Sequence, residues 1–192
     1  MSDAPTSKTT NPPESVLWEL PGELMMWVLI ISELLVFGAA LAGFLAVRIG
    51  QVERFTADQA LLSQTAGALN TIVLVTSGMF AALAVHKRHL GQRLAARLWL
   101  LAAASGGVIF LIVKSVEYAA KWDAGIGIDT SPFFSFYFLI TGFHAAHVIA
   151  GIVLLGIVAW FDTPRNMETG VSFWHMVDLV WVLLFPIIYL LR

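Results

Sequence analysis

The sequence predicts an all-α integral membrane protein with five transmembrane helices. Of its 192 residues, 58% are hydrophobic and only 12% are charged, and the mean hydropathy is +0.81. Soluble domains carry roughly twice this charged fraction. The apolar residues gather into blocks, each able to supply the ~20 residues that a helix needs to cross about 30 Å of hydrocarbon. Because lipid offers the backbone no hydrogen-bonding partners, each block is predicted to be helical.

The chain divides into a polar segment and a transmembrane domain. Residues 1–22 are polar, contain prolines and have no basic stretch leading into a short apolar core, so they are predicted to be a cytoplasmic tail and not a cleaved signal peptide. Residues 23–192 form the transmembrane domain. Its predicted spans are 24–47, 67–85, 98–116, 133–161 and 171–191. The fourth span is long enough to tilt, and Pro186 is expected to kink the fifth.

Basic residues set the predicted orientation. The connection HKRHLGQRLAAR between the second and third spans contains four Lys or Arg residues and no acid, so it is predicted to be cytoplasmic. The N-terminus is then cytoplasmic and the C-terminus external. Arg48 and Arg54 in the first connection oppose this assignment, but the four bases in one short loop outweigh them.

Composition also excludes several chemistries. The chain has no cysteine, which excludes thiolate metal sites, iron–sulfur clusters, disulfides and c-type haem attachment. The net charge of −2 does not bear on nucleic acid, but no basic run resembles a nucleic-acid footprint, so we expect no nucleic-acid partner.

Polar side chains inside the predicted spans are the candidate functional residues. An ionisable group at this depth costs about 2.5–3.5 kcal/mol, so such groups usually face protein and find partners. Three sets follow from a rise of about 1.5 Å per residue. They are two buried carboxylates, Glu33 and Asp178; an interhelical polar seam, His144, His147, His175 and Asp178; and an outer polar cluster, Asn70, Lys114 and Glu117.

The histidines of FHAAHVIAG allow several interpretations. His144 and His147 lie just under one helical turn apart and so share a face. His147 with His175 could ligate a haem, and both fourth-span histidines with a carboxylate could ligate iron or zinc. A proton relay is a further possibility. A hydrogen-bonded seam is the favoured interpretation, with His147 predicted to pair with Asp178 at the same depth.

The first span has two contrasting faces. Gly38, Ala42 and Ala46 form a small-residue stripe suited to close helix contact. Glu33 lies on the other, bulkier face with Phe37. The sequence therefore predicts that the stripe packs against neighbouring helices, while Glu33 lies beside lipid or a partner subunit.

Motifs along the chain resemble subunit III of the haem-copper oxidases. They are ISELLVFGA, LNTIVLVTSG, KSVEYAAKWDAGI, GFHAAHVIAG and FWHMVDLVWVLLFPIIYL, in family order. The signatures FHxxHV and WHxVDxVW are specific because each fixes several polar and aromatic residues at set spacing. The resemblance implies a subunit with no catalytic or metal-binding residues and no cofactor of its own, which packs beside the catalytic subunit, binds phospholipid and supports proton uptake. It also implies that Glu33 is the family's buried helix carboxylate and Asp178 the acid of its last helix.

The chain departs from the larger members of this family. The mitochondrial form has seven helices, and this chain lacks the first two, which form one wall of the family's lipid cleft. Five-helix quinol-oxidase members tend to carry Asp where this chain has Glu33. The opening PGELMMWVLIISELLVFGA and the short length resemble the members associated with bacterial nitric oxide reductase.

The expected function is that of a non-catalytic subunit III-like component of a respiratory haem-copper complex in the bacterial cytoplasmic membrane, accessory to nitric oxide reductase. Its expected partners are that catalytic subunit and membrane lipids. Subunit III of a cytochrome c or quinol oxidase is the alternative. A stand-alone haem-binding electron carrier stays open, and a transporter is disfavoured because no paired broken helices or inverted repeats are visible.

Overall fold

The fold is a bundle of long helices. The computed structural model describes residues 24–161 and 163–191, so the predicted tail at 1–22 lies outside the described residues. The elements are α1 (Leu24–Ile49), α2 (Val52–Ala60), α3 (Gln64–His89), α4 (Arg93–Asp123), α5 (Pro132–Trp160), α6 (Pro164–Phe185) and the π-helix η2 (Pro186–Leu190). Five helices, counting α6 and η2 as one, are long and apolar enough to cross a membrane, and the described residues contain no strand. The predicted fold class is confirmed.

Polar capping residues set where α3, α5 and α6 begin, ahead of the predicted spans that start at 67, 133 and 171. Ser63, Ser131 and Thr163 each accept a hydrogen bond from the backbone N–H three residues later, at 3.3 Å in all three cases. Such caps satisfy backbone donors that the first helical turn leaves free. In α5 and α6 a proline follows the cap, where its missing N–H does no harm. The short helix α2 was not predicted, because its polar sequence VERFTADQA falls between two spans.

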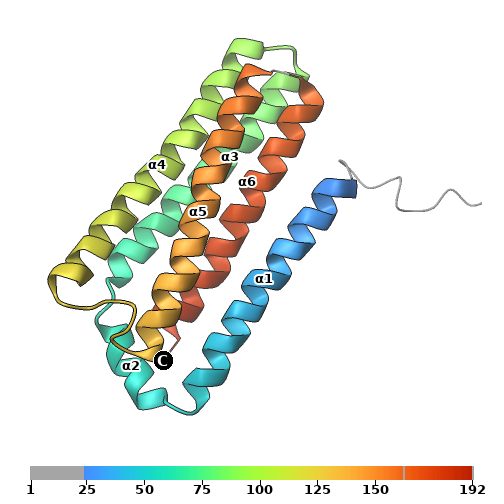
Figure 1. The fold of residues 1–192 in the computed structure, drawn as a ribbon. Helices are drawn as coiled ribbons and strands as arrows, with labels where there is room; N and C mark the ends of the chain where they lie inside the picture. Colours follow the sequence, from blue (N-terminus) through green and yellow to red (C-terminus); the bar gives the residue numbers. More distant parts are fainter. Residues whose placement is uncertain (1–23, 162, 192) are drawn as a thin grey trace, which may run out of the picture.

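α6 is the central helix and α1 the peripheral one. α6 contacts α1, α3 and α5, and half of its most apolar stretch is buried, whereas only 17% of the corresponding stretch of α1 is buried. Figure 1 shows α3 to α6 side by side, with α1 along one side of the bundle. Much of the surface of α1 is therefore left to lipid or to another protein.

Trp174 fixes the packing of α6 against three neighbours. Its side chain is fully buried, and its indole N–H donates to Ser77 Oγ on α3 at 3.0 Å. A Cβ atom added at Gly107 or Gly151 would lie 2.5 Å or 2.6 Å from the indole ring. These glycines on α4 and α5 therefore provide the space that the indole occupies.

The chain changes from α to π geometry at Pro186. Proline has no N–H to donate to the preceding turn, which explains why the α-helix ends there. The C-terminal carbonyls of a helix lack intrahelical partners, and here side chains from distant segments bond to them. The bonds run from Gln59 Nε2 to Ile188 O (2.9 Å), from Gln64 Nε2 to Tyr189 O (3.3 Å) and from Arg48 Nη2 to Leu191 O (3.0 Å). We call these three bonds the C-terminal clasp.

Candidate functional site

A buried ion pair lies at the end of the bundle nearest to the C-terminal clasp. Lys114 Nζ is 3.0 Å from Glu117 Oε2, and the two side chains are only 2% and 4% exposed. The ammonium group also donates to the hydroxyls of Tyr137, at 3.0 Å, and Tyr189, at 2.6 Å. The Tyr189 hydroxyl in turn lies 3.0 Å from both carboxylate oxygens of Glu117. The charges are thus paired and hydrogen-bonded, as a buried ion pair requires.

Aromatic rings enclose this ion pair. Nζ of Lys114 lies 4.6 Å from the ring centroid of Tyr137 and 5.2 Å from those of Tyr118 and Tyr189, within cation–π range. The sequence prediction missed these tyrosines. A usable signal was present, because the chain has only three tyrosines and all of them lie in or beside predicted spans.

Asn70 is buried but does not bond to the ion pair. Its Nδ2 donates to the carbonyl of Phe110 at 3.5 Å, one turn from Lys114, and its Oδ1 has no partner among the described residues. The outer cluster predicted from the sequence thus contains a bonded pair, Lys114 and Glu117, and a neighbouring amide that bonds elsewhere.

His147 pairs with Glu33, and not with Asp178 as predicted. Nε2 of His147 lies 3.1 Å from Glu33 Oε2 on α1, while its Nδ1 donates to the carbonyl of Phe143 at 2.9 Å. Because a carbonyl only accepts, Nδ1 is the donor in this bond, and Nε2 is the ring nitrogen that faces the Glu33 carboxyl group. The prediction failed because equal depth does not fix which neighbouring helix a side chain faces.

The orientation predicted for α1 is also reversed. Gly38, Ala42 and Ala46 are exposed, and a Cβ atom added at Gly38 would meet nothing within 4 Å. The bulky face packs inward instead, with the Phe37 ring centroid 5.1 Å from that of Phe143 on α5. Large aromatic side chains bury more apolar area than a small-residue stripe, and they bring Glu33 to α5 with them.

His144 lies apart from the other predicted seam residues, inside the bundle. It is fully buried and stacks on Trp181 with ring centroids 5.3 Å apart, and the edges of Phe110 and Phe37 face it at 5.5 Å and 6.2 Å. Neither ring nitrogen has a hydrogen-bonding partner within the described ranges. The two histidines of FHAAHVIAG are therefore on one side of α5 but enter different surroundings.

His175 and Asp178 lie on the side of α6 that faces α3. His175 is exposed, whereas Asp178 is 8% exposed and rests against Gly78 of α3. Oδ1 of Asp178 has no hydrogen-bonding partner in the part of the chain that the structure describes. The four predicted seam residues thus occupy three separate places and form no single seam.

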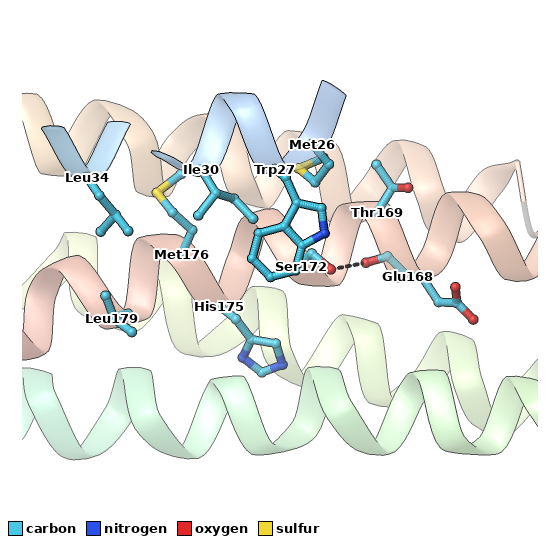
Figure 2. A pocket seen from close by; sticks show the side chains of 10 residues that line it. All are labelled: Met26, Trp27, Ile30, Leu34, Glu168, Thr169, Ser172, His175, Met176 and Leu179. Carbon is cyan, nitrogen blue, oxygen red and sulfur yellow. Dashed lines mark hydrogen bonds between the residues drawn. The ribbon is translucent and has the colours of Figure 1, made fainter. Parts of the chain in front are cut away.

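The histidine positions do not fit the ligand sets considered from the sequence. His147 faces α1, whereas His175 points toward α3 (Figure 2), so their rings do not face each other across a haem-sized space. Across residues 24–161 and 163–191, no group of three or more His, Asp or Glu residues is placed to hold a metal ion.

A groove of about 430 Å³ separates the first half of α1 from α6. Figure 2 shows its walls: Met26, Trp27, Ile30 and Leu34 from α1, and Glu168, Thr169, Ser172, His175, Met176 and Leu179 from α6. The lining is mostly apolar, with polar groups concentrated toward Glu168. This combination suits an apolar chain with a polar end.

Fold and site together define a multi-pass helical membrane protein whose polar side chains are used mainly in contacts between helices. The sequence pattern of cytochrome c oxidase subunit III matches residues 21–192, and the chain belongs to this family. This confirms the resemblance to subunit III of the haem-copper oxidases.

Curated relatives agree with the family match. Cytochrome c oxidase subunit 3 of Thermostichus vulcanus is 30% identical over 180 residues, which cover 88% of this chain and 86% of the relative. Cytochrome c oxidase subunit 3 of Corynebacterium diphtheriae is 35% identical over 130 residues, 64% of this chain and 63% of the relative. Heme-copper oxidase subunit I+III of Aeropyrum pernix is 29% identical over 190 residues, 90% of this chain but only 23% of the relative.

Proposed function

We propose that this chain is a non-catalytic subunit III of a respiratory haem-copper complex in a bacterial cytoplasmic membrane. The family match over residues 21–192 carries the proposal. The Aeropyrum pernix relative supports it, since its name joins subunits I and III in one chain. In this role the chain binds the catalytic subunit and supports its assembly, its stability and its proton and lipid environment, with no cofactor of its own.

The Lys114–Glu117 pair serves the fold in this proposal. Both charges are buried and both are bonded to tyrosine hydroxyls, so their hydrogen bonds are made within the bundle. The pair holds α4, α5 and η2 at one fixed spacing.

Glu33 and His147 supply the proton environment in this proposal. His147 Nε2 lies 3.1 Å from Glu33 Oε2 at about the middle of α5, and the side chains of Glu33 and His147 are 26% and 14% exposed, so the pair is open to its surroundings on one side. A phospholipid acyl chain is proposed to occupy the nearby groove between α1 and α6, whose lining is mostly apolar.

Two catalytic partners are candidates. The resemblance of PGELMMWVLIISELLVFGA and the short length favour a nitric oxide reductase, for which this chain is an accessory subunit. The names of the relatives from Thermostichus vulcanus and Corynebacterium diphtheriae favour a cytochrome c oxidase.

Purification from native membranes tests the proposal. The tagged chain is extracted in mild detergent, the large subunit that accompanies it is identified by mass spectrometry, and the complex is assayed for reduction of nitric oxide and of oxygen. A haem-copper catalytic subunit is expected in stoichiometric amount, and the preferred substrate distinguishes the two partners. Recovery of the chain without any haem protein would contradict the proposal.

A further inference from the structure

A second, shallower groove lies on the outer surface between α3 and α6. It measures about 370 Å³, and its walls include Val75, Gly78 and Met79 from α3, and His175, Asp178 and Val182 from α6. The walls are apolar apart from the imidazole group of His175 and the carboxyl group of Asp178. The second groove opens between other helices than the groove between α1 and α6 in Figure 2, although His175 and Leu179 border both.

Asp178 is the unusual residue of this second groove. Its side chain is more than nine-tenths buried, yet Oδ1 has no hydrogen-bonding partner within the described residues. A Cβ atom at Gly78 would overlap Oδ2 of Asp178 and would lie 3.4 Å from Nδ1 of His175. The glycine thus leaves a notch in α3 that accommodates the carboxyl group, while the bundle itself provides no donor for it. Buried polar groups are normally satisfied, so an orphaned one needs an explanation.

The depth of Asp178 excludes a lipid headgroup as its partner. Asp178 lies 14 residues after Pro164 and 12 before Leu190, or about 21 Å and 18 Å along the helix from its two ends. Acyl chains at mid-membrane carry no hydrogen-bond donor. Ionisable residues at such depth usually face protein. His175, which lies beside Asp178 in this groove, is exposed on the bundle surface. Asp178 lines this groove, so a donor on another polypeptide seated there could reach its carboxyl group.

We infer that the groove between α3 and α6 docks a transmembrane helix of the catalytic subunit, which donates a hydrogen bond from a polar or basic side chain to Asp178. This inference rests on the proposed function. A second copy of this chain fits less well where the two-fold axis passes near Asp178, because the two Asp178 carboxyl groups would then meet. Val75, Met79 and Val182 supply apolar contact around the polar bond.

Site-specific photo-cross-linking in the intact complex tests the docking surface. A photoreactive amino acid is placed at Met79 or Val182 in the groove, and at Leu101 or Ile157 as exposed controls on α4 and α5. Cross-links to the catalytic subunit are expected from the groove positions only. Cross-links from the controls alone, in a complex that still purifies, would overturn the docking surface and leave the proposed function intact. Failure of the unmodified chain to purify with a catalytic subunit would overturn both.

Substitution of Asp178 tests the predicted hydrogen bond. In Asp178→Leu we expect affinity for the catalytic subunit to fall on the order of tenfold, because the buried hydrogen bond to the carboxyl group is lost. The melting temperature of the isolated subunit should not fall, because the orphaned oxygen forms no hydrogen bond inside it. Asp178→Asn keeps the shape of the side chain and should lie between Asp178→Leu and the unmodified chain in affinity. Lower melting temperatures in both variants with unchanged retention in the complex would assign Asp178 to the fold and overturn the inference.

Discussion

Removal of Lys114 alone should destabilise the bundle far more than removal of Lys114 and Glu117 together. In Lys114→Met the apolar stem is retained, but Glu117 loses its cation and the hydroxyls of Tyr137 and Tyr189 lose their donor. Glu117 is left as a carboxylate that is 4% exposed and bonded only to Tyr189. An uncompensated buried charge of this kind costs about 3–5 kcal/mol.

This estimate exceeds what loss of the hydrogen bonds alone would cost. Interhelical hydrogen bonds in membranes average only about 0.6 kcal/mol and reach about 1.7 kcal/mol. Desolvation of the remaining charge therefore dominates the effect. In Lys114→Met/Glu117→Gln both charges are absent and the amide still bonds to Tyr189, so the double variant should lose no more than about 2 kcal/mol.

The free energy of unfolding is measured in mixed micelles as the fraction of denaturing detergent rises. Four proteins are compared: the unmodified chain, Lys114→Met, Glu117→Gln and the double variant. A strongly favourable coupling between the two positions is expected. Additive losses, or a loss below about 1 kcal/mol in Lys114→Met, would refute the view that the pair is a desolvated unit.

Three further outcomes follow from the same structure. Gly151→Val should lower the melting temperature sharply, because its Cβ atom would lie 2.6 Å from the ring of Trp174. The control Gly156→Ala, whose Cβ atom would meet nothing within 4 Å, should be neutral or slightly stabilising. Equal effects of the two substitutions would contradict this packing. A hydrophobic carbodiimide should label Glu33 ahead of Glu117, because their side chains are 26% and 4% exposed. Peptide mass spectrometry would identify the labelled residue. Preferential labelling of Glu117 would contradict its burial. The purified chain freed of its partner should show no stoichiometric haem absorbance; a b-type spectrum lost on substitution of a histidine would restore the electron-carrier alternative.

The sequence was sufficient for the span count and the family but not for the side that each polar residue faces. The thickness of the bilayer sets the length of an apolar block that can cross it, so the five helices could be predicted from block length. Helix ends depend on capping side chains such as Ser63 and Thr163, which a hydropathy pattern does not weigh. α2 escaped prediction because its sequence, VERFTADQA, is polar and falls between two spans.

Facing directions failed because they depend on which helix becomes the neighbour. Glu33 was assigned to lipid or a partner subunit, but the aromatic contacts of Phe37 turn this face toward α5 and bring the carboxyl group to His147. Depth along a helix is a one-dimensional estimate and cannot distinguish His147–Glu33 from His147–Asp178. In contrast, Lys114 and Glu117 lie three residues apart on one helix, so their proximity follows from helical geometry alone.

The C-terminal clasp has a consequence for how the chain is made. Its acceptors, the carbonyls of residues 188, 189 and 191, leave the ribosome after every helix that supplies a donor to them. Until then Arg48, Gln59 and Gln64 are inserted without these partners, and the first helices remain incompletely anchored. A nascent chain halted before Pro186 would expose these three polar side chains near the membrane boundary, where proteases that remove unfinished membrane proteins could distinguish it from a completed one.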